Sequence, residues 1–111
     1  MEKFEGIVKL TNDYMFDSQI GWKWTTMHIY KFVDDEDKVY VWKTASYLGI
    51  DHEEDNGELW WEKATVGSTI KIKASIKCEN EYRGEAQTVL NRVKVIEIID
   101  RALTKEEKDE V

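Results

Sequence analysis

Hydrophobic and polar residues alternate with a period of two along residues 22–45, in two runs separated by the acidic segment FVDDEDK. Because successive side chains of a β-strand point to opposite faces, this alternation predicts two strands joined as a hairpin. One predicted face is aliphatic and contains Met27, Ile29, Val39 and Val41. The other face is aromatic with polar tips, and its members are Trp22, Trp24, Thr26, His28, Tyr30, Tyr40, Trp42 and Thr44.

The alternation is compatible with two assignments of these faces. In the first, the aliphatic face lies in the core and the aromatic face is a surface on which flat ligands stack. In the second, the aromatic face is itself the core, since aromatic residues are good strand formers and cross-strand aromatic pairs stabilise sheets without a ligand. The first assignment predicts exposed rings at Trp24, Tyr30 and Trp42.

Alternation also predicts three further strands. Residues 4–10 form the first, and residues 11–21 follow as a polar loop that carries Tyr14 and Phe16. Residues 69–78 have an apolar face that ends in Cys78 and a basic face, so we expect a half-buried strand with an inert core thiol. After a loop over residues 79–87, residues 88–99 make the last strand.

Two segments remain outside these strands. Glu58 to Ala64 consists largely of good helix formers, which predicts a short helix or a loop between the third and fourth strands. The acidic tail, residues 100–111, has capping-box spacing at Thr104 and Glu107, which predicts a short helix.

This order of strands and loops is that of an OB-fold. The segments GSTIKIKASIK and ENEYRGEAQTVLNRVKV resemble the last two strands of OB-fold single-stranded nucleic-acid-binding domains. The match lies in their tyrosine–basic–glycine and Gln-Thr turn, at Tyr82, Arg83, Gly84, Gln87 and Thr88. YVWKTA also resembles the third strand of small OB proteins of phages and mobile elements. The resemblance implies an all-β, five-stranded OB-fold barrel over residues 1–99.

OB-folds bind oligonucleotides on the face of strands two and three and on the loops that flank it. The resemblance therefore implies a nucleic-acid site on the aromatic face, with cations from the basic strands for the backbone. The candidate site residues are Trp24, His28, Tyr30, Tyr40, Trp42, Tyr82, Arg83, Lys71, Lys73 and Arg92.

The charge distribution qualifies this expectation. The formal net charge is −7, which is the wrong sign for binding nucleic acid by bulk electrostatics. Residues 69–96, however, carry six lysines and arginines against three acidic residues, so one segment of an acidic chain is basic. A local anion-binding surface is compatible with this pattern.

Other functional classes have little support in the sequence. The two histidines, His28 and His52, lack metal-ligand spacing, and there is no phosphate-binding loop or nucleophile motif, so we expect no catalytic residue, metal or cofactor. No apolar run approaches the length of a membrane span, and the single cysteine allows no internal disulfide. We therefore expect a cytoplasmic protein, in a bacterial cell or a phage-infected host, without membrane association.

The expected function is single-stranded DNA binding in replication or recombination. The alternative is a protein-interaction module or inhibitor, for example a phage-encoded one that acts on a host nucleic-acid-binding or defence protein through its acidic surface or tail. The net charge favours the alternative, and the basic segment favours DNA.

Overall fold

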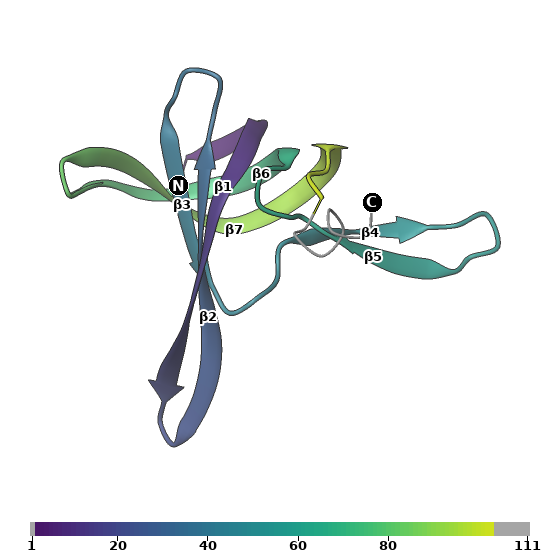
Figure 1. The fold of residues 1–111 in the computed structure, drawn as a ribbon, viewed down its shortest axis with the longest axis horizontal. Coiled ribbons are helices and arrows are strands. Elements are labelled where there is room, and N and C mark those ends of the chain that lie inside the picture. Colours follow the sequence, from purple (N-terminus) through teal and green to yellow (C-terminus); the bar gives the residue numbers. More distant parts are fainter. Residues whose placement is uncertain (1, 104–111) are drawn as a thin grey trace.

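Seven β-strands make up the regular structure of residues 2–103, which are the residues that the computed structural model describes (Figure 1). The strands are β1 (Lys3–Ile20), β2 (Lys23–Val33), β3 (Val39–Thr44), β4 (Gly49–Glu53), β5 (Leu59–Lys63), β6 (Thr69–Tyr82) and β7 (Glu85–Asp100). The fold is therefore all-β, as the sequence predicts. Within the described residues, no helix is long and apolar enough to cross a membrane.

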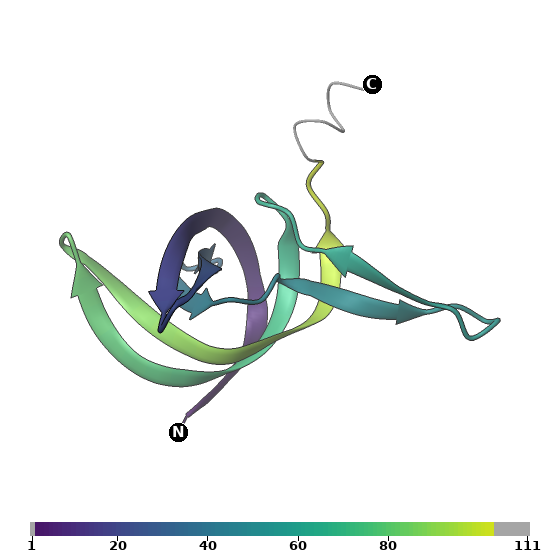
Figure 2. The same cartoon turned by 90° about the horizontal axis from the view of Figure 1, so that it is seen from below.

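Five of the strands form one sheet that closes on itself in the order β1-β2-β3-β7-β6, and we refer to it as the closed sheet. The length of β1 explains the closure, because its first part pairs with β6 and the remainder with β2. A register shift between Leu10 and Asn12 falls where β1 changes partner. All neighbouring strands are antiparallel except β3 and β7, which are parallel. Figure 2 shows the strong curvature of β1, β6 and β7 around the core.

Besides the β2–β3 turn, three hairpins project from the closed sheet in different directions (Figure 1). Two of them are the far ends of β1–β2 and β6–β7, and the third is β4–β5, which forms a separate two-stranded sheet. Gly21, with φ of 65°, opens the two-residue turn between β1 and β2. Arg83 and Gly84 have φ values of 51° and 80°, the pair of positive φ angles that a type I′ hairpin turn needs.

The core lies inside the closed sheet and is partly aromatic. Tyr30 and Phe32 of β2 are almost completely buried, and the ring of Tyr40 packs on that of Phe4 at 4.5 Å between centroids. The other buried hydrophobic residues of this core are Val8, Leu10, Leu48, Ala64, Ile70, Ile72, Ala74, Leu90 and Val95. The predicted apolar face of residues 69–78 is thus confirmed at Ile70, Ile72 and Ala74.

The first assignment of the two hairpin faces is confirmed at Trp24, which is 68% exposed, but it is wrong from His28 onward, because there the aromatic face points into the core. His28, Tyr30 and Tyr40 are 1%, 1% and 3% exposed, whereas Met27, Ile29 and Val41 lie partly exposed on the outside. The polar tips find protein partners at the ends of the sheet. The Tyr30 hydroxyl donates to the Ser46 carbonyl and accepts from the Leu48 N–H, both at 3.2 Å. Val39, at 8% exposure, is buried as predicted.

Three further expectations are also wrong. Residues 58–64 contain strand β5 rather than a helix, because they pair with β4. The predicted loops over residues 11–21 and 79–87 are largely strand, since the hairpins of β1–β2 and β6–β7 continue through them. Cys78 is exposed, because β6 has by then left the core. The predicted helix at Thr104 and Glu107 lies outside the described residues.

Candidate nucleic-acid interface

The outside of β1, β2 and β3 carries a patch of aromatic and aliphatic side chains beside a lysine. We call it the outer face, and its residues are Tyr14, Phe16, Met27, Ile29, Val41 and Lys43. The strand register places them together, because Tyr14 pairs with Ile29, Phe16 with Met27, and Ile29 with Lys43. Paired residues of antiparallel strands project on the same side of the sheet.

Two side-chain contacts fix the orientation of this face. The Lys43 ammonium lies 5.5 Å from the centroid of the Phe16 ring, a cation–π distance. Tyr14 is 62% exposed and Phe16 is 37% exposed, so both rings remain open to a ligand. Lys31, on the same side of β2, forms a 3.1 Å ion pair with Glu85 of the β6–β7 hairpin. The outer face therefore extends toward that hairpin, where Val41 of β3 pairs with Val89 of β7.

The tip of the β1–β2 hairpin adds two highly exposed tryptophans. Trp22 is 84% exposed in the turn, and Trp24 is 68% exposed on β2. The Lys23 ammonium lies 5.4 Å from the Trp22 ring centroid. Trp22 and Lys23 therefore form an aromatic–cation pair like that of Phe16 and Lys43. The tip can therefore offer a flat surface and a positive charge to the same ligand.

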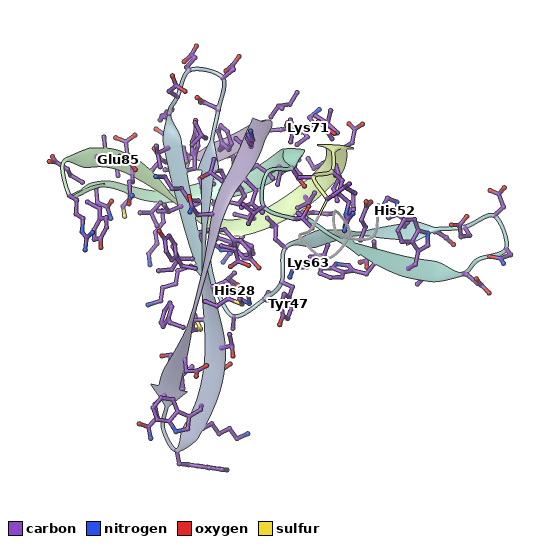
Figure 3. All side chains as sticks on the ribbon, in the orientation of Figure 1. His28, Tyr47, His52, Lys63, Lys71 and Glu85 are labelled. Atoms are coloured by element: carbon purple, nitrogen blue, oxygen red, sulfur yellow. The ribbon has the colours of Figure 1, made fainter. Side chains whose placement is uncertain are left out.

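The tip of the β6–β7 hairpin has a similar composition. Tyr82 is 58% exposed, and the guanidinium group of Arg83 lies 5.2 Å from its ring centroid. The type I′ turn places both side chains at the end of the hairpin, away from the core. Figure 3 shows Glu85, two residues after Arg83, on this hairpin and far from His28.

The structure separates the sequence-predicted site residues into three groups. Trp24, Tyr82 and Arg83 are exposed on hairpin tips. His28, Tyr30 and Tyr40 are buried, and Trp42 is half-buried with its ring 6.0 Å from that of Tyr30, so they cannot present a stacking surface together. The predicted cations form the third group. Lys71, Lys73 and Arg92 lie on β6 and β7, where Lys73 and Arg92 border a separate shallow hollow.

Two buried polar groups of the predicted site have a structural explanation. His28 Nδ1 lies 2.9 Å from a carboxylate oxygen of Asp13, and its ring is stacked 5.2 Å from the Tyr30 ring. The Tyr40 hydroxyl donates to Asp34 at 3.0 Å. Burial, and then the Asp34 hydrogen bond, raise the pKa of Tyr40 to about 12. These contacts stabilise the protein and place no reactive group at the surface.

Asp34 also organises the β2–β3 turn. Its carboxylate accepts hydrogen bonds from the N–H groups of Glu36 and Lys38, both at 2.9 Å. Partial burial alone would raise the pKa of Asp34, but these bonds and the Tyr40 hydroxyl outweigh it and hold the pKa below its usual value. The acidic segment that the sequence predicts as a turn is therefore held by its own first carboxylate.

Other exposed groups lie on the β4–β5 hairpin. The His52 ring is stacked on Trp60 at 4.1 Å, and its Nε2 lies 2.8 Å from Glu62. Trp60 and Trp61 are each 46% exposed. A pocket of about 330 Å³ lies between β5 and the closed sheet, lined by Asp13, Lys63, Ala64, Thr65, Val66, Arg101 and Leu103. Figure 3 shows Lys63 with Tyr47 and His28 in this region.

Sequence reasoning missed the outer face because it treated Tyr14 and Phe16 as loop residues. A signal was present, since Tyr14, Phe16, Ser18 and Ile20 occupy alternate positions. This periodicity indicates a strand, but the neighbouring Asp13 and Asp17 make the segment resemble a polar loop. Among the described residues, no cluster of three or more histidine, cysteine, aspartate or glutamate side chains is arranged to hold a metal ion.

No known family model matches the sequence, and neither the curated proteins nor the solved structures contain a match.

Proposed function

We propose that this chain is a single-stranded DNA-binding protein with an OB-fold, which acts in replication or recombination. In this proposal, DNA bases stack on the outer face and on the tips of the two hairpins beside it. The sequence predicts the site on the aromatic face of the two strands in residues 22–45. The proposed site lies on the same strands, β2 and β3, but on the outer face.

The strand arrangement supports the OB-fold. An OB-fold is a five-stranded Greek-key barrel that binds oligonucleotides across its second and third strands and the connections after strands one and four. Here the closed sheet has five strands, and its second and third strands are β2 and β3. The corresponding connections are the ends of the β1–β2 and β6–β7 hairpins, and both carry exposed aromatic residues.

The observation that carries the proposal is the pair Phe16 and Lys43 on the outer face. The Phe16 ring can stack on a base, and Lys43, held 5.5 Å from its centroid, can contact the adjacent phosphate. Tyr14 supplies a second ring two residues away on the same strand. Stacking contributes about 1–3 kcal/mol per base, so two rings can give useful affinity despite the net negative charge.

The direct test is fluorescence anisotropy of labelled oligo-dT with the wild-type protein and a Tyr14→Ala/Phe16→Ala variant. We expect wild-type binding, and we expect the variant to lose about 1–3 kcal/mol for each ring that stacks on a base. The matched control is Trp60→Ala/Trp61→Ala, which removes two exposed rings from the β4–β5 hairpin. Equal losses in the two variants would contradict the assignment to the outer face.

A second candidate function is recognition of a protein partner through the β4–β5 hairpin. Leu59, Trp60 and Trp61 are consecutive exposed apolar residues on that hairpin, at 74%, 46% and 46% exposure. The net charge of −7 would favour a basic partner. Absence of oligo-dT binding at low salt would favour this candidate over the first.

A further inference from the structure

A shallow hollow of about 200 Å³ on β1, β6 and β7 gathers four cationic side chains. Its lining residues are Lys3, Lys73, Ala74, Ser75, Arg92 and Lys94. The ion pairs of the described residues involve His28, Lys31, His52 and Arg101, and none of the four cations of this hollow. In a chain with 23 acidic residues, a hollow lined by four cations without an ion-paired carboxylate needs an explanation.

The strand register adds to the electrostatic cost of this arrangement. Lys73 of β6 is the direct partner of Lys94 of β7, and like charges opposite each other on paired strands destabilise a sheet. Glu5 lies opposite Lys73 on the other side but forms no ion pair with it among the described residues. An anion bound between the lysines would remove this repulsion.

The backbone at Arg92 is an independent observation. Arg92 has φ of 54°, in the left-handed region that a residue other than glycine rarely adopts. It lies in a stretch where the β6–β7 register shifts, between the pairs Lys73–Lys94 and Ser75–Asn91. The Asn91 side chain accepts a hydrogen bond from the Arg92 N–H at 3.0 Å and holds this conformation. Bulges of this kind re-aim side chains and occur often beside functional sites.

We propose that this hollow binds the phosphodiester backbone of a single nucleic-acid strand, and we call it the anion hollow. The inference rests on the proposed function and extends it, because the anion hollow lies apart from the outer face. Along β7, Val89 is next to β3 and the outer face, and Arg92 begins the anion hollow three residues later. A strand that stacks on the outer face can continue along β7 to these cations.

The ligand chemistry follows from the side chains that line the hollow. Three lysines and one arginine provide donors and positive charge for phosphate oxygens, and the lining contains no aromatic ring. Bases therefore have no stacking partner there. We expect the hollow to bind a sugar–phosphate backbone with no preference for base identity.

The test uses an abasic oligonucleotide, which has the phosphodiester backbone without bases, in an NMR titration of the full chain at low salt. We expect amide shifts at residues 73, 92 and 94, and no shifts at Tyr14 and Phe16. A Lys73→Gln/Lys94→Gln variant should lose this binding, whereas the matched control Lys9→Gln/Lys38→Gln, which removes two exposed lysines elsewhere, should keep it.

The outcomes separate this inference from the proposed function. No shifts in the hollow would overturn the inference, even if oligo-dT binds the outer face. Equal loss in the hollow variant and its control would also overturn it, because diffuse charge would then explain the binding. If inorganic phosphate at the same concentration shifts the amides of residues 73, 92 and 94 equally, the hollow binds a single ion and not a strand. That result would overturn the inference. Abasic binding in the hollow without oligo-dT contacts on the outer face would retain the inference and refute the stacking site.

Discussion

Tyr30 and Tyr40 show why the aromatic pattern of β2 and β3 is compatible with two structural assignments. Each buries its ring in the core and extends its hydroxyl group to a hydrogen-bond partner at the end of the sheet, Ser46 in one case and Asp34 in the other. A sequence with alternating rings and polar tips is therefore compatible with both a stacking surface and a satisfied core. The hydrogen-bond partners that show these rings to be core residues come close to them only in the folded protein.

Burial of these tyrosines predicts a loss of stability at alkaline pH. Burial, followed by the Asp13 charge, raises the pKa of Tyr30 to about 12, and the pKa of Tyr40 is raised to about 12 as well. Their stabilising contribution is fully present below the unfolded-state pKa of 10 and is lost as the pH rises toward 12, because the unfolded chain ionises first. Denaturant unfolding across this range should show a falling free energy of unfolding.

The matched variants for this measurement are Tyr40→Phe and Tyr14→Phe. The free energy of unfolding of Tyr40→Phe should fall less steeply with pH than that of the wild type, because one buried phenol is removed. Tyr14→Phe changes an exposed ring and should leave the slope unchanged. Identical slopes in all three proteins would contradict the burial of Tyr40.

Trp42 provides a second prediction at this scale. Its half-buried ring is stacked near Tyr30 and packs against the core cluster. Trp42→Ala should therefore lower the free energy of unfolding by about 2–3 kcal/mol, less than for a fully buried aromatic residue because part of the ring is already exposed. Phe16→Ala, on the outer face, should lower the free energy of unfolding much less, as measured by chemical denaturation of both variants. A destabilisation by Trp42→Ala below about 1 kcal/mol would place the ring outside the core.

At the scale of elements, the hairpins differ in what holds them. The β1–β2 and β6–β7 hairpins extend strands that belong to the closed sheet, whereas β4 and β5 pair only with each other. The base of the β4–β5 hairpin is closed by the Ala64 N–H, which donates to the Leu48 carbonyl at 2.8 Å. Its packing depends on a close approach at Gly49, where a Cβ atom would overlap the Trp61 ring and the Glu62 carbonyl.

Gly49→Ala should therefore disrupt the β4–β5 hairpin selectively. The added methyl group forces β4 away from β5, while the core of the closed sheet is formed largely by other strands. Hydrogen exchange of the variant should show lost protection in residues 49–63. The amides of β1, β2, β6 and β7 in the same sample are the internal control, and equal loss throughout would show that the hairpin and the closed sheet unfold together.

Local periodicity accounts for the part of the fold that the sequence predicts. Residues 22–45 and 69–78 alternate clearly, and both contain strands of the closed sheet. Glu58–Ala64 does not alternate in this way, and its helix formers become a strand only because β4 is available as a partner. Similarly, nothing in the local sequence tells which side of an alternating strand faces the core. The assignment depends on long-range contacts, such as His28 with Asp13 and Tyr30 with Leu48.

At the scale of the whole molecule, the acidic turn, the anion hollow and the exposed rings occupy different regions. The acidic β2–β3 turn lies at one end of the closed sheet, the anion hollow covers part of β1, β6 and β7, and the exposed rings occupy the outer face and hairpin tips. Net charge alone would argue against DNA binding, but locally unbalanced cations can bind a backbone within an acidic protein.

This arrangement predicts a salt dependence that varies with DNA length. A short strand that contacts only the outer face and the β1–β2 tip, through Lys43 and Lys23, should give a slope of log affinity against log salt of about −1.4, since each phosphate contact contributes about −0.7. A strand long enough to reach also the four cations of the anion hollow should give about −4. Anisotropy titrations at several salt concentrations with oligo-dT of increasing length measure this change. A slope independent of length would mean that one strand does not span both surfaces.

The most direct measurement of the central claim is an NMR titration of the full chain with oligo-dT, read at the side chains and amides of the outer face. We expect shifts at Tyr14, Phe16, Met27, Ile29 and Lys43, and no comparable shifts on the β4–β5 hairpin. No binding at low salt, or shifts confined to Leu59, Trp60 and Trp61, would contradict the claim that the outer face binds single-stranded DNA.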